Sequence, residues 1–315
     1  MGKHTSIAWT DHTFNPWRGC TRVSSGCDNC YAESWSKRNP SVLGVWGDNG
    51  TRVVASDSYW REPLRWDRDA AKRGVRERVF CASLADVFED RTDLVDPRAR
   101  LWRLIALTPN LDWLLLTKRP ENAAHMADRA AGPGGYDGSL LRVPVKPWPS
   151  NVWLGTTVEN QAMADARIPR ILCVPAAVRF LSCEPLLEAV DLGLMWRTDT
   201  GRWDSTGREL PLRRIDWVIC GGESGAHARP FDVAWARSLV AQCRSAGVAC
   251  FVKQLGARPA IAPDELAHRG WSAASAVVDD CGGIHTKDRA GADPSEWPTD
   301  LRVQEWPHSM AAEGR

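Results

Sequence analysis

The stretch Asp112–Asn122, DWLLLTKRPEN, combines a short apolar run with an abrupt change to charged and polar residues. The run is too short for a typical helix and too continuously apolar for a strand that keeps one face in water. Strands buried on both faces are typical of parallel sheets covered by helices. The stretch therefore predicts a buried parallel strand whose polar residues begin the following loop.

The same pattern recurs along the chain, with helix-like segments between the runs. In residues 96–109, DPRARLWRLIALTP, an Asp-Pro pair gives a helix start signal and the apolar side chains fall on one face. This alternation predicts an α/β fold with a complete or partial (β/α) barrel of about six to eight parallel strands, with an open doubly wound sheet as the alternative. The recurring runs are RVFCASLADVFED (78–90), NVWLGTTVENQ (151–161), VRFLSCEPLLE (178–188), IDWVICGGESG (215–225) and ACFVKQLG (249–256).

Length, charge and hydropathy limit the class of protein. The 315 residues suffice for one large domain or two modest ones, and the formal net charge of +1 provides no global attraction to nucleic acid. The sequence has no apolar run long enough to span a bilayer and no secretion signal, so we expect a cytoplasmic protein without a membrane partner. We expect the barrel to occupy residues 1–256, and a small extension or hairpin cap to follow over residues 257–315, where the composition changes.

Polar side chains follow the apolar runs, at the predicted carboxyl ends of the strands. In a parallel barrel, chemistry gathers at this edge. At a single position, capping of the next helix is the simpler interpretation, but six such strand ends favour a shared polar pocket. The candidate catalytic residues are Asp86, Lys118, Glu184 and Glu223, and the candidate cofactor-binding residues are Tyr31, Ser83, Thr117, Thr157, Glu159, Ser182 and Lys253.

Two cations stand side by side after one of these runs. Lys118 and Arg119 are placed to grip a phosphate or the carboxylate of a cofactor, and Lys253 supplies a cation at another strand end. A surface ion pair with Glu159 or Glu184 is the alternative interpretation.

Three cysteines, Cys20, Cys27 and Cys30, share one loop after the first predicted strand, HTFNPW. In a reducing compartment, clustered cysteines bind metal or perform redox chemistry more often than they form disulfides. A [4Fe–4S] cluster held by three thiolates keeps one iron open for a small molecule to chelate. Zinc, with His12 or Asp28 as a fourth ligand, is the alternative, and three unligated thiols come last. The other cysteines are scattered singly, and we expect most of them to be buried thiols.

The chain resembles known proteins at these residues. The cysteine loop looks like the cluster loop of the radical S-adenosylmethionine superfamily. The whole chain is similar to a phage- and bacteria-associated family of unknown function that is known for a three-cysteine motif. The matching stretches, which span residues 9–256, are WTDHTFNPWRGCTRVSSGCDNCYAE, SLADVFED, LLLTKRPEN, GTTVENQ, LSCEPLL, CGGESGAHARP and KQLG.

The resemblance implies a cofactor, a reaction type and a partner. A [4Fe–4S] cluster on Cys20, Cys27 and Cys30 would bind S-adenosylmethionine at its open iron. One electron from an external reductant would then release a 5′-deoxyadenosyl radical, which modifies a nucleotide, nucleic acid or protein. Genes of similar proteins often lie beside one for a three-Cys-motif partner protein. The alternative is a zinc-binding barrel that works either as a phage protein interacting with nucleic acid or as a hydrolytic phage protein.

The chain departs from the superfamily pattern in three respects. The residue before the third cysteine is usually aromatic, whereas here it is Asn29, with Tyr31 just after Cys30. Six residues separate Cys20 from Cys27, where the superfamily usually has three. The superfamily's Gly-Gly-Glu stretch normally follows the second strand, whereas GGES at residues 221–224 follows a late one. The resemblance therefore supports the cluster and the fold more strongly than it supports cleavage of S-adenosylmethionine.

Overall fold

The computed structural model describes residues 5, 7–130, 148–193, 215–261, 277–278 and 283–307. Contacts between Cα atoms divide the chain into two units. Unit 1 consists of Met1–Thr156 with Cys173–Ala177, and unit 2 consists of Thr157–Leu172 with Val178–Arg315. Parts of the predicted extension, residues 262–276, 279–282 and 308–315, lie outside the described residues.

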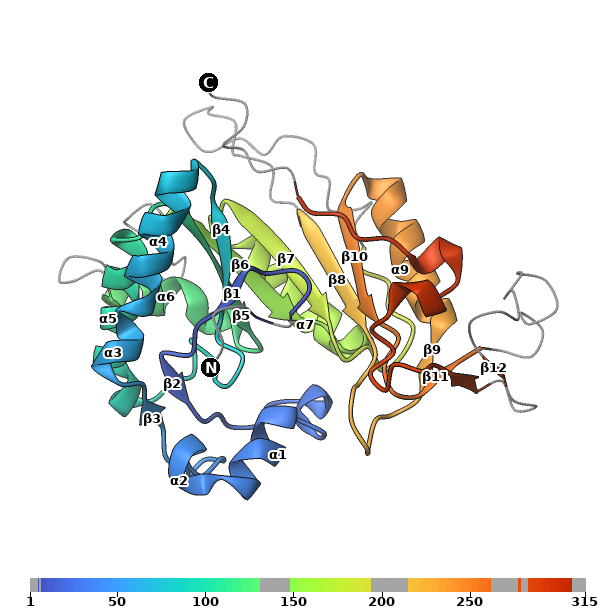
Figure 1. Cartoon of the computed structure of the whole chain (residues 1–315), viewed down its shortest axis with the longest axis horizontal. Coiled ribbons are helices and arrows are strands. Elements are labelled where there is room, and N and C mark those ends of the chain that lie inside the picture. Colours follow the sequence, from blue (N-terminus) through green and yellow to red (C-terminus); the bar gives the residue numbers. More distant parts are fainter. Residues whose placement is uncertain are drawn as a thin grey trace. The chain divides into compact units, whose positions relative to one another are not determined.

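The main sheet has seven strands in the order β1-β4-β5-β6-β7-β8-β10 (Figure 1). Parallel registers join β1 to β4, β4 to β5, β5 to β6, β7 to β8 and β8 to β10. Spatial order therefore follows chain order, as it does in a (β/α) barrel, whereas a doubly wound sheet reverses its order partway. The prediction of an α/β fold with a partial TIM-like barrel is confirmed, and the doubly wound alternative is wrong.

Unit 1 contains the strand that the opening stretch predicts. In β5, the neighbouring side chains of Trp113, Leu114 and Leu115 are all 0% exposed, so both faces of the strand are buried. The segment predicted to be helical over residues 96–109 forms α5. The principal elements are β1 (His12–Thr13), α4 (Glu62–Arg73), β4 (Glu77–Cys81), α5 (Val95–Ala106), β5 (Leu111–Thr117), α6 (Pro120–Ala130) and β6 (Val152–Thr157), whose last residue belongs to unit 2.

An insertion between β1 and β4 carries the three cysteines. It opens and closes on an antiparallel pair, β2 (Trp17–Arg18) with β3 (Val53–Val54), and thus leaves and returns at one place. Between these strands lie η1 (Ser25–Cys27), α1 (Tyr31–Arg38) and α2 (Pro40–Leu43), and α3 (Asp57–Trp60) follows.

Unit 2 contains the later strands and the C-terminal segment. The α9 helix begins after Asp232, whose side chain accepts a hydrogen bond from Ala234 N at 2.9 Å, and ends at Gly247, which has a φ of 65°. The C-terminal segment bonds to β10, with Val252 N donating to Val303 O at 2.8 Å. It therefore gives an end strand of the sheet an additional partner.

The unit's elements are α7 (Gln161–Leu172), β7 (Val178–Cys183), β8 (Trp217–Gly221), β9 (Phe231–Asp232), α9 (Val233–Ala246), β10 (Ala249–Gln254), β11 (Pro259–Ala260), β12 (Val277–Val278), β13 (Ile284–His285), η3 (Pro294–Glu296) and η4 (Thr299–Leu301). Among the described residues, no helix is both long enough and apolar enough to cross a membrane.

Candidate functional site

The cysteine loop of unit 1 follows β2 in the chain, and in space it starts beside the residues just beyond the carboxyl end of β4. Gly19 N donates to Leu84 O at 3.0 Å, and Gly19 forms a parallel bridge with Ala85, just beyond β4. Gly19 has a φ of 112°, and a Cβ added there would lie 2.6 Å from Thr51 O. Glycine is therefore required at the point where the loop meets the sheet. This is the edge at which (β/α) barrels carry their chemistry.

The three thiols share this loop without forming a finished ligand set. Each of Cys20, Cys27 and Cys30 is half-buried. Cys27 ends the short helix η1, and Cys30 lies directly before α1, with Cys30 N bonded to Cys27 O at 3.3 Å. Within the described residues, no group of three or more Cys, His, Asp or Glu side chains is placed to hold a metal ion. Binding of one metal centre by all three thiols therefore requires the loop to close.

Arg119 lies against the first cysteine. Its Nη1 is 3.8 Å from Cys20 Sγ, and its Nη2 donates to Thr21 O at 2.9 Å. The same Nη1 lies 3.0 Å from Asp86 Oδ2. Arg119 is 8% exposed, so the surface ion pair with Glu159 or Glu184 is wrong for this residue. Its partner is a buried aspartate, Asp86, in the loop that follows the neighbouring strand β4.

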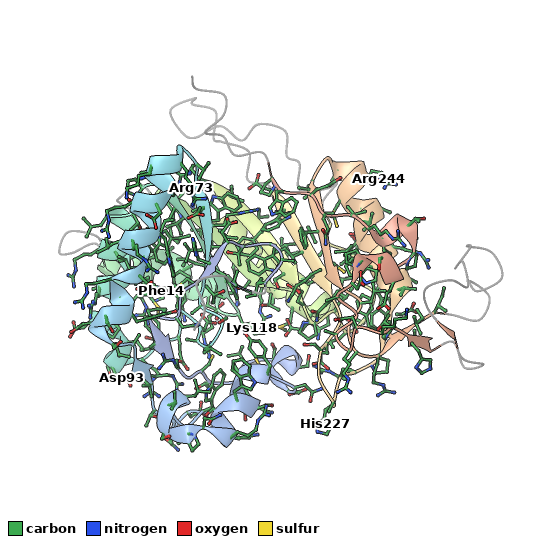
Figure 2. All side chains as sticks on the ribbon, viewed as in Figure 1. Phe14, Arg73, Asp93, Lys118, His227 and Arg244 are labelled. Atoms are coloured by element: carbon green, nitrogen blue, oxygen red, sulfur yellow. The ribbon has the colours of Figure 1, made fainter. Side chains whose placement is uncertain are left out.

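Asp86 receives hydrogen bonds from several donors. Its Oδ1 accepts from Thr117 Oγ1 at 2.7 Å and from Phe88 N at 3.0 Å, while its Oδ2 accepts from Lys118 N at 3.0 Å as well as from Arg119. The residue is 5% exposed. This carboxylate joins the loop after β4 to the end of β5 and to Lys118, which is labelled in Figure 2. Of the predicted site residues, Asp86, Thr117 and Lys118 are thus brought together.

A second buried ion pair supports the same loop. Arg52 Nε and Nη2 donate to the two carboxylate oxygens of Glu89, each at 2.6 Å, and Nη2 also donates to Thr21 Oγ1 at 2.9 Å. The side chains of Arg52 and Glu89 are 1% and 4% exposed. The sequence interpretation missed this pair, because the two residues are far apart in the chain and no local pattern joins them.

The electrostatic surroundings of Cys20 favour its thiol. The pKa of Cys20 is raised to about 12, chiefly by burial and then by the charge of Asp86, while Arg119 acts in the opposite direction. Burial by itself would lower the pKa of Arg119, but the charges of Asp86 and Cys20 raise it, so the guanidinium stays positive. Metal binding at Cys20 would therefore displace a proton.

Two further predicted residues meet beside the loop. Tyr31 OH donates to Ser83 O at 2.8 Å, and the ring of Tyr31 packs edge-on against Trp35 with centroids 5.9 Å apart. Asn15, which is 1% exposed, accepts from Leu84 N at 2.8 Å and donates to Ser83 Oγ at 3.0 Å. Ser83 is therefore hydrogen-bonded by both Tyr31 and Asn15. Asn15 was not among the predicted residues.

His12 is occupied elsewhere. Its Nε2 lies 3.0 Å from Glu77 Oε2, and its ring stacks on Trp66 with centroids 4.3 Å apart. To ligate a metal through Nε2 on the cysteine loop, His12 would have to break this bond and leave the stack. One of the two expected fourth ligands for zinc thus has another structural role.

In unit 2, the ends of β7 and β10 bring an ion pair together. Lys253 Nζ lies 2.9 Å from Glu184 Oε1, with the side chains 27% and 13% exposed. Ser182 Oγ is 3.4 Å from Glu184 Oε2. A Cβ on Gly221 would lie 3.1 Å from Glu184 Oε1, so this glycine gives the carboxylate room. Beyond this ion pair, the buried Glu184 Oε1 accepts no hydrogen bond from the described residues, so it can accept one further donor from a ligand.

Two other predicted acids of unit 2 are closed into internal pairs. Glu159 is 0% exposed, and its Oε2 is 2.7 Å from Arg167 Nη1, which also donates to Thr157 O at 2.9 Å. Glu223 Oε2 accepts from Arg229 N at 2.8 Å and from Arg229 Nε at 3.1 Å. The contacts of Arg167 fix α7 against the last residue of β6, and the contacts of Arg229 close the loop after β8.

Each unit thus gathers part of the predicted site. Unit 1 joins Asp86, Thr117 and Cys20 through Arg119, and unit 2 joins Ser182, Glu184 and Lys253. A single pocket that unites all the strand ends stays a prediction.

Comparison with known proteins gives one match. A family model described as a protein of unknown function, DUF5131, matches residues 4–287. No curated protein and no solved structure matches the chain.

Proposed function

We propose that this chain, which belongs to the DUF5131 family of proteins of unknown function, is an iron–sulfur enzyme of the radical S-adenosylmethionine type. One observation carries the proposal: a loop with three cysteines lies beside the carboxyl end of β4, in a sheet whose strands follow barrel order. In barrels this edge faces the substrate site. The phage association and the three-Cys-motif partner protein belong to the same proposal and rest on the sequence resemblance.

The donor set of the loop suits an iron–sulfur cluster by kind and number. Three thiols are present, and His12 is held by Glu77 and Trp66. A cluster with three protein ligands needs no fourth residue, whereas a structural zinc site almost always has four. When bound, the cluster would supply the electron that cleaves S-adenosylmethionine to the hydrogen-abstracting radical.

The protein's own residues then have separate tasks. The Asp86–Arg119 pair and the Arg52–Glu89 pair hold the start of the cysteine loop. The Lys253–Glu184 pair of unit 2 offers one cation and one carboxylate, which complement a ligand carrying both a carboxylate and an ammonium group. The proposed substrate class is a nucleotide, a nucleic acid or a protein.

Anaerobic reconstitution tests the proposal. We expect brown protein that bleaches with dithionite and forms 5′-deoxyadenosine when S-adenosylmethionine is added to the reduced form. The measurements are iron content and chromatography of the nucleoside products. Colourless protein that carries one equivalent of zinc would replace the proposal with the zinc-binding alternative.

Neutralising Glu184 is expected to weaken ligand binding without affecting the cluster. Loss of a charge-assisted hydrogen bond of about 1.5–3 kcal/mol corresponds to roughly 10- to 100-fold weaker binding of S-adenosylmethionine by Glu184→Gln. Calorimetric titration of the iron-loaded protein measures the change.

Glu188→Gln is the matched control. Glu188 is exposed, and its Oε1 accepts from Gln161 N at 2.8 Å, a bond that an amide oxygen can retain. Equal affinities for Glu184→Gln and Glu188→Gln would show that Glu184 has only a structural part in unit 2.

A further inference from the structure

The contacts of Arg119 assign this residue a task beyond an ion pair. We propose that Arg119 is the positioning residue of the cysteine site: it fixes Cys20 and donates an N–H to its sulfur, which makes a bound iron–sulfur centre easier to reduce. The redox part of this inference rests on the function proposed above. The positioning part applies to any metal held by the three thiols.

The guanidinium is fixed before any metal arrives. Nη1 is shared between Asp86 Oδ2 at 3.0 Å and Cys20 Sγ at 3.8 Å, and Nη2 donates to Thr21 O at 2.9 Å. The backbone of Arg119 is also held, since its N–H donates to Thr117 Oγ1 at 2.8 Å. Because Arg119 is 8% exposed, water does not compete strongly for these contacts. The guanidinium of Arg119 therefore presents one N–H to Cys20 Sγ in a fixed geometry.

The buried ion pairs around Cys20 balance in formal charge, and Arg119 provides the cationic contact to its sulfur. The buried set contains two cations, Arg119 and Arg52, and two anions, Asp86 and Glu89. Both oxygens of Glu89 accept from Arg52, and both oxygens of Asp86 accept from other donors. The sulfur itself has two polar contacts: Cys20 Sγ donates to Thr21 O at 3.4 Å, and Arg119 Nη1 donates to the sulfur at 3.8 Å.

This contact has a predictable sign. Hydrogen bonds and positive charge at a ligating sulfur stabilise the reduced, more negative state of an iron–sulfur centre and raise its reduction potential. Removal of the contact should therefore make the potential more negative. A change in loop packing alone would not be expected to shift the reduction potential in this direction. It would also not be expected to be reversed by a lysine at position 119.

The redox test compares iron-loaded variants by mediated titration. At the wild-type midpoint potential, we expect Arg119→Met to show a roughly tenfold lower ratio of reduced to oxidised centre, equivalent to about 59 mV for one electron. Arg119→Lys should recover part of this shift, because it returns the positive charge. Arg103→Met is the matched control, since it makes the same substitution at an exposed arginine of α5, outside the cysteine loop. Equal potentials for Arg119→Met and wild type would overturn the redox role.

A second test needs no iron. Cobalt(II) titrated into the metal-free protein reports thiolate ligation through its charge-transfer absorption. We expect Arg119→Met to weaken cobalt binding about tenfold, in the direction of Cys20→Ser, with Arg103→Met close to wild type. A tenfold change corresponds to about 1.4 kcal/mol. Unchanged cobalt affinity in Arg119→Met would overturn the positioning role.

The two tests separate this inference from the proposed function. Wild-type protein that takes up cobalt but never iron would refute the proposed enzyme while the positioning role stands on the cobalt result. Wild-type protein that binds neither metal refutes both. If Arg119→Met does not fold, the double variant with Asp86→Asn removes the unpaired buried carboxylate and is titrated in its place.

Discussion

Serine in place of Cys20, Cys27 or Cys30 is expected to abolish iron loading of protein reconstituted without oxygen. Each thiolate supplies one of three protein bonds to the proposed cluster, and a serine hydroxyl stays protonated where a thiol ionises on metal binding. Two remaining thiolates do not retain the cluster. Iron and sulfide content, together with the visible absorption, measures the loss.

Two other cysteines provide the controls. Cys173 is exposed and Cys81 is buried, and both lie outside the three-cysteine loop. Cys173→Ser and Cys81→Ala should load iron as the wild type does. Full iron content in the triple variant of the loop would show that another part of the chain holds the metal, and the proposed chemistry would then have no basis at the cysteine loop.

The fold could be predicted because its signal is local. Each buried strand is a short apolar run, and each run ends where a polar loop begins. The burial of Trp113, Leu114 and Leu115 on both faces of β5 is the outcome that the run LDWLLLT implies. Helix signals were equally local, as the Asp-Pro pair at residues 96–97, in the first turn of α5, shows. The order of the strands then followed from their alternation with helices.

The contacts of the site could not be predicted in the same way. Asn15 and Ser83 bond across 68 positions of the chain, and Arg52 and Glu89 across 37. No spacing rule joins such residues, because the insertion that carries Arg52 determines where they meet. The gathering of Asp86 and Thr117 was predictable only as a shared sheet edge. The hydrogen bonds to both carboxylate oxygens of Asp86 could not be predicted.

Glu159 shows where a polar strand end misleads. The sequence places it among loop residues and suggests a cofactor contact, whereas the side chain is 0% exposed and paired with Arg167. One signal was available. Arg167 falls on the buried face of α7, beside Ala164 and Ile168, where an arginine requires an internal anion.

Arg167→Met is therefore expected to destabilise the protein strongly. It leaves the Glu159 carboxylate buried without its cation, a change that costs about 3–5 kcal/mol. The expected fall in Tm is roughly 10 °C, since about 1 kcal/mol corresponds to a few degrees in a chain of this size class. Thermal unfolding followed by circular dichroism measures the fall.

The double variant Arg167→Met/Glu159→Gln separates a structural role from ligand binding. It removes both charges, so it should recover much of the lost stability. Arg170→Met is the control, because Arg170 is exposed on the same helix. If Arg167→Met melts with the wild type while Glu159→Gln loses affinity for S-adenosylmethionine, Glu159 belongs to the ligand site as first predicted. If the fall in Tm occurs and the folded double variant still binds ligand, the Glu159 carboxylate holds α7 in place, and Glu184 is the carboxylate of unit 2 that serves ligand binding.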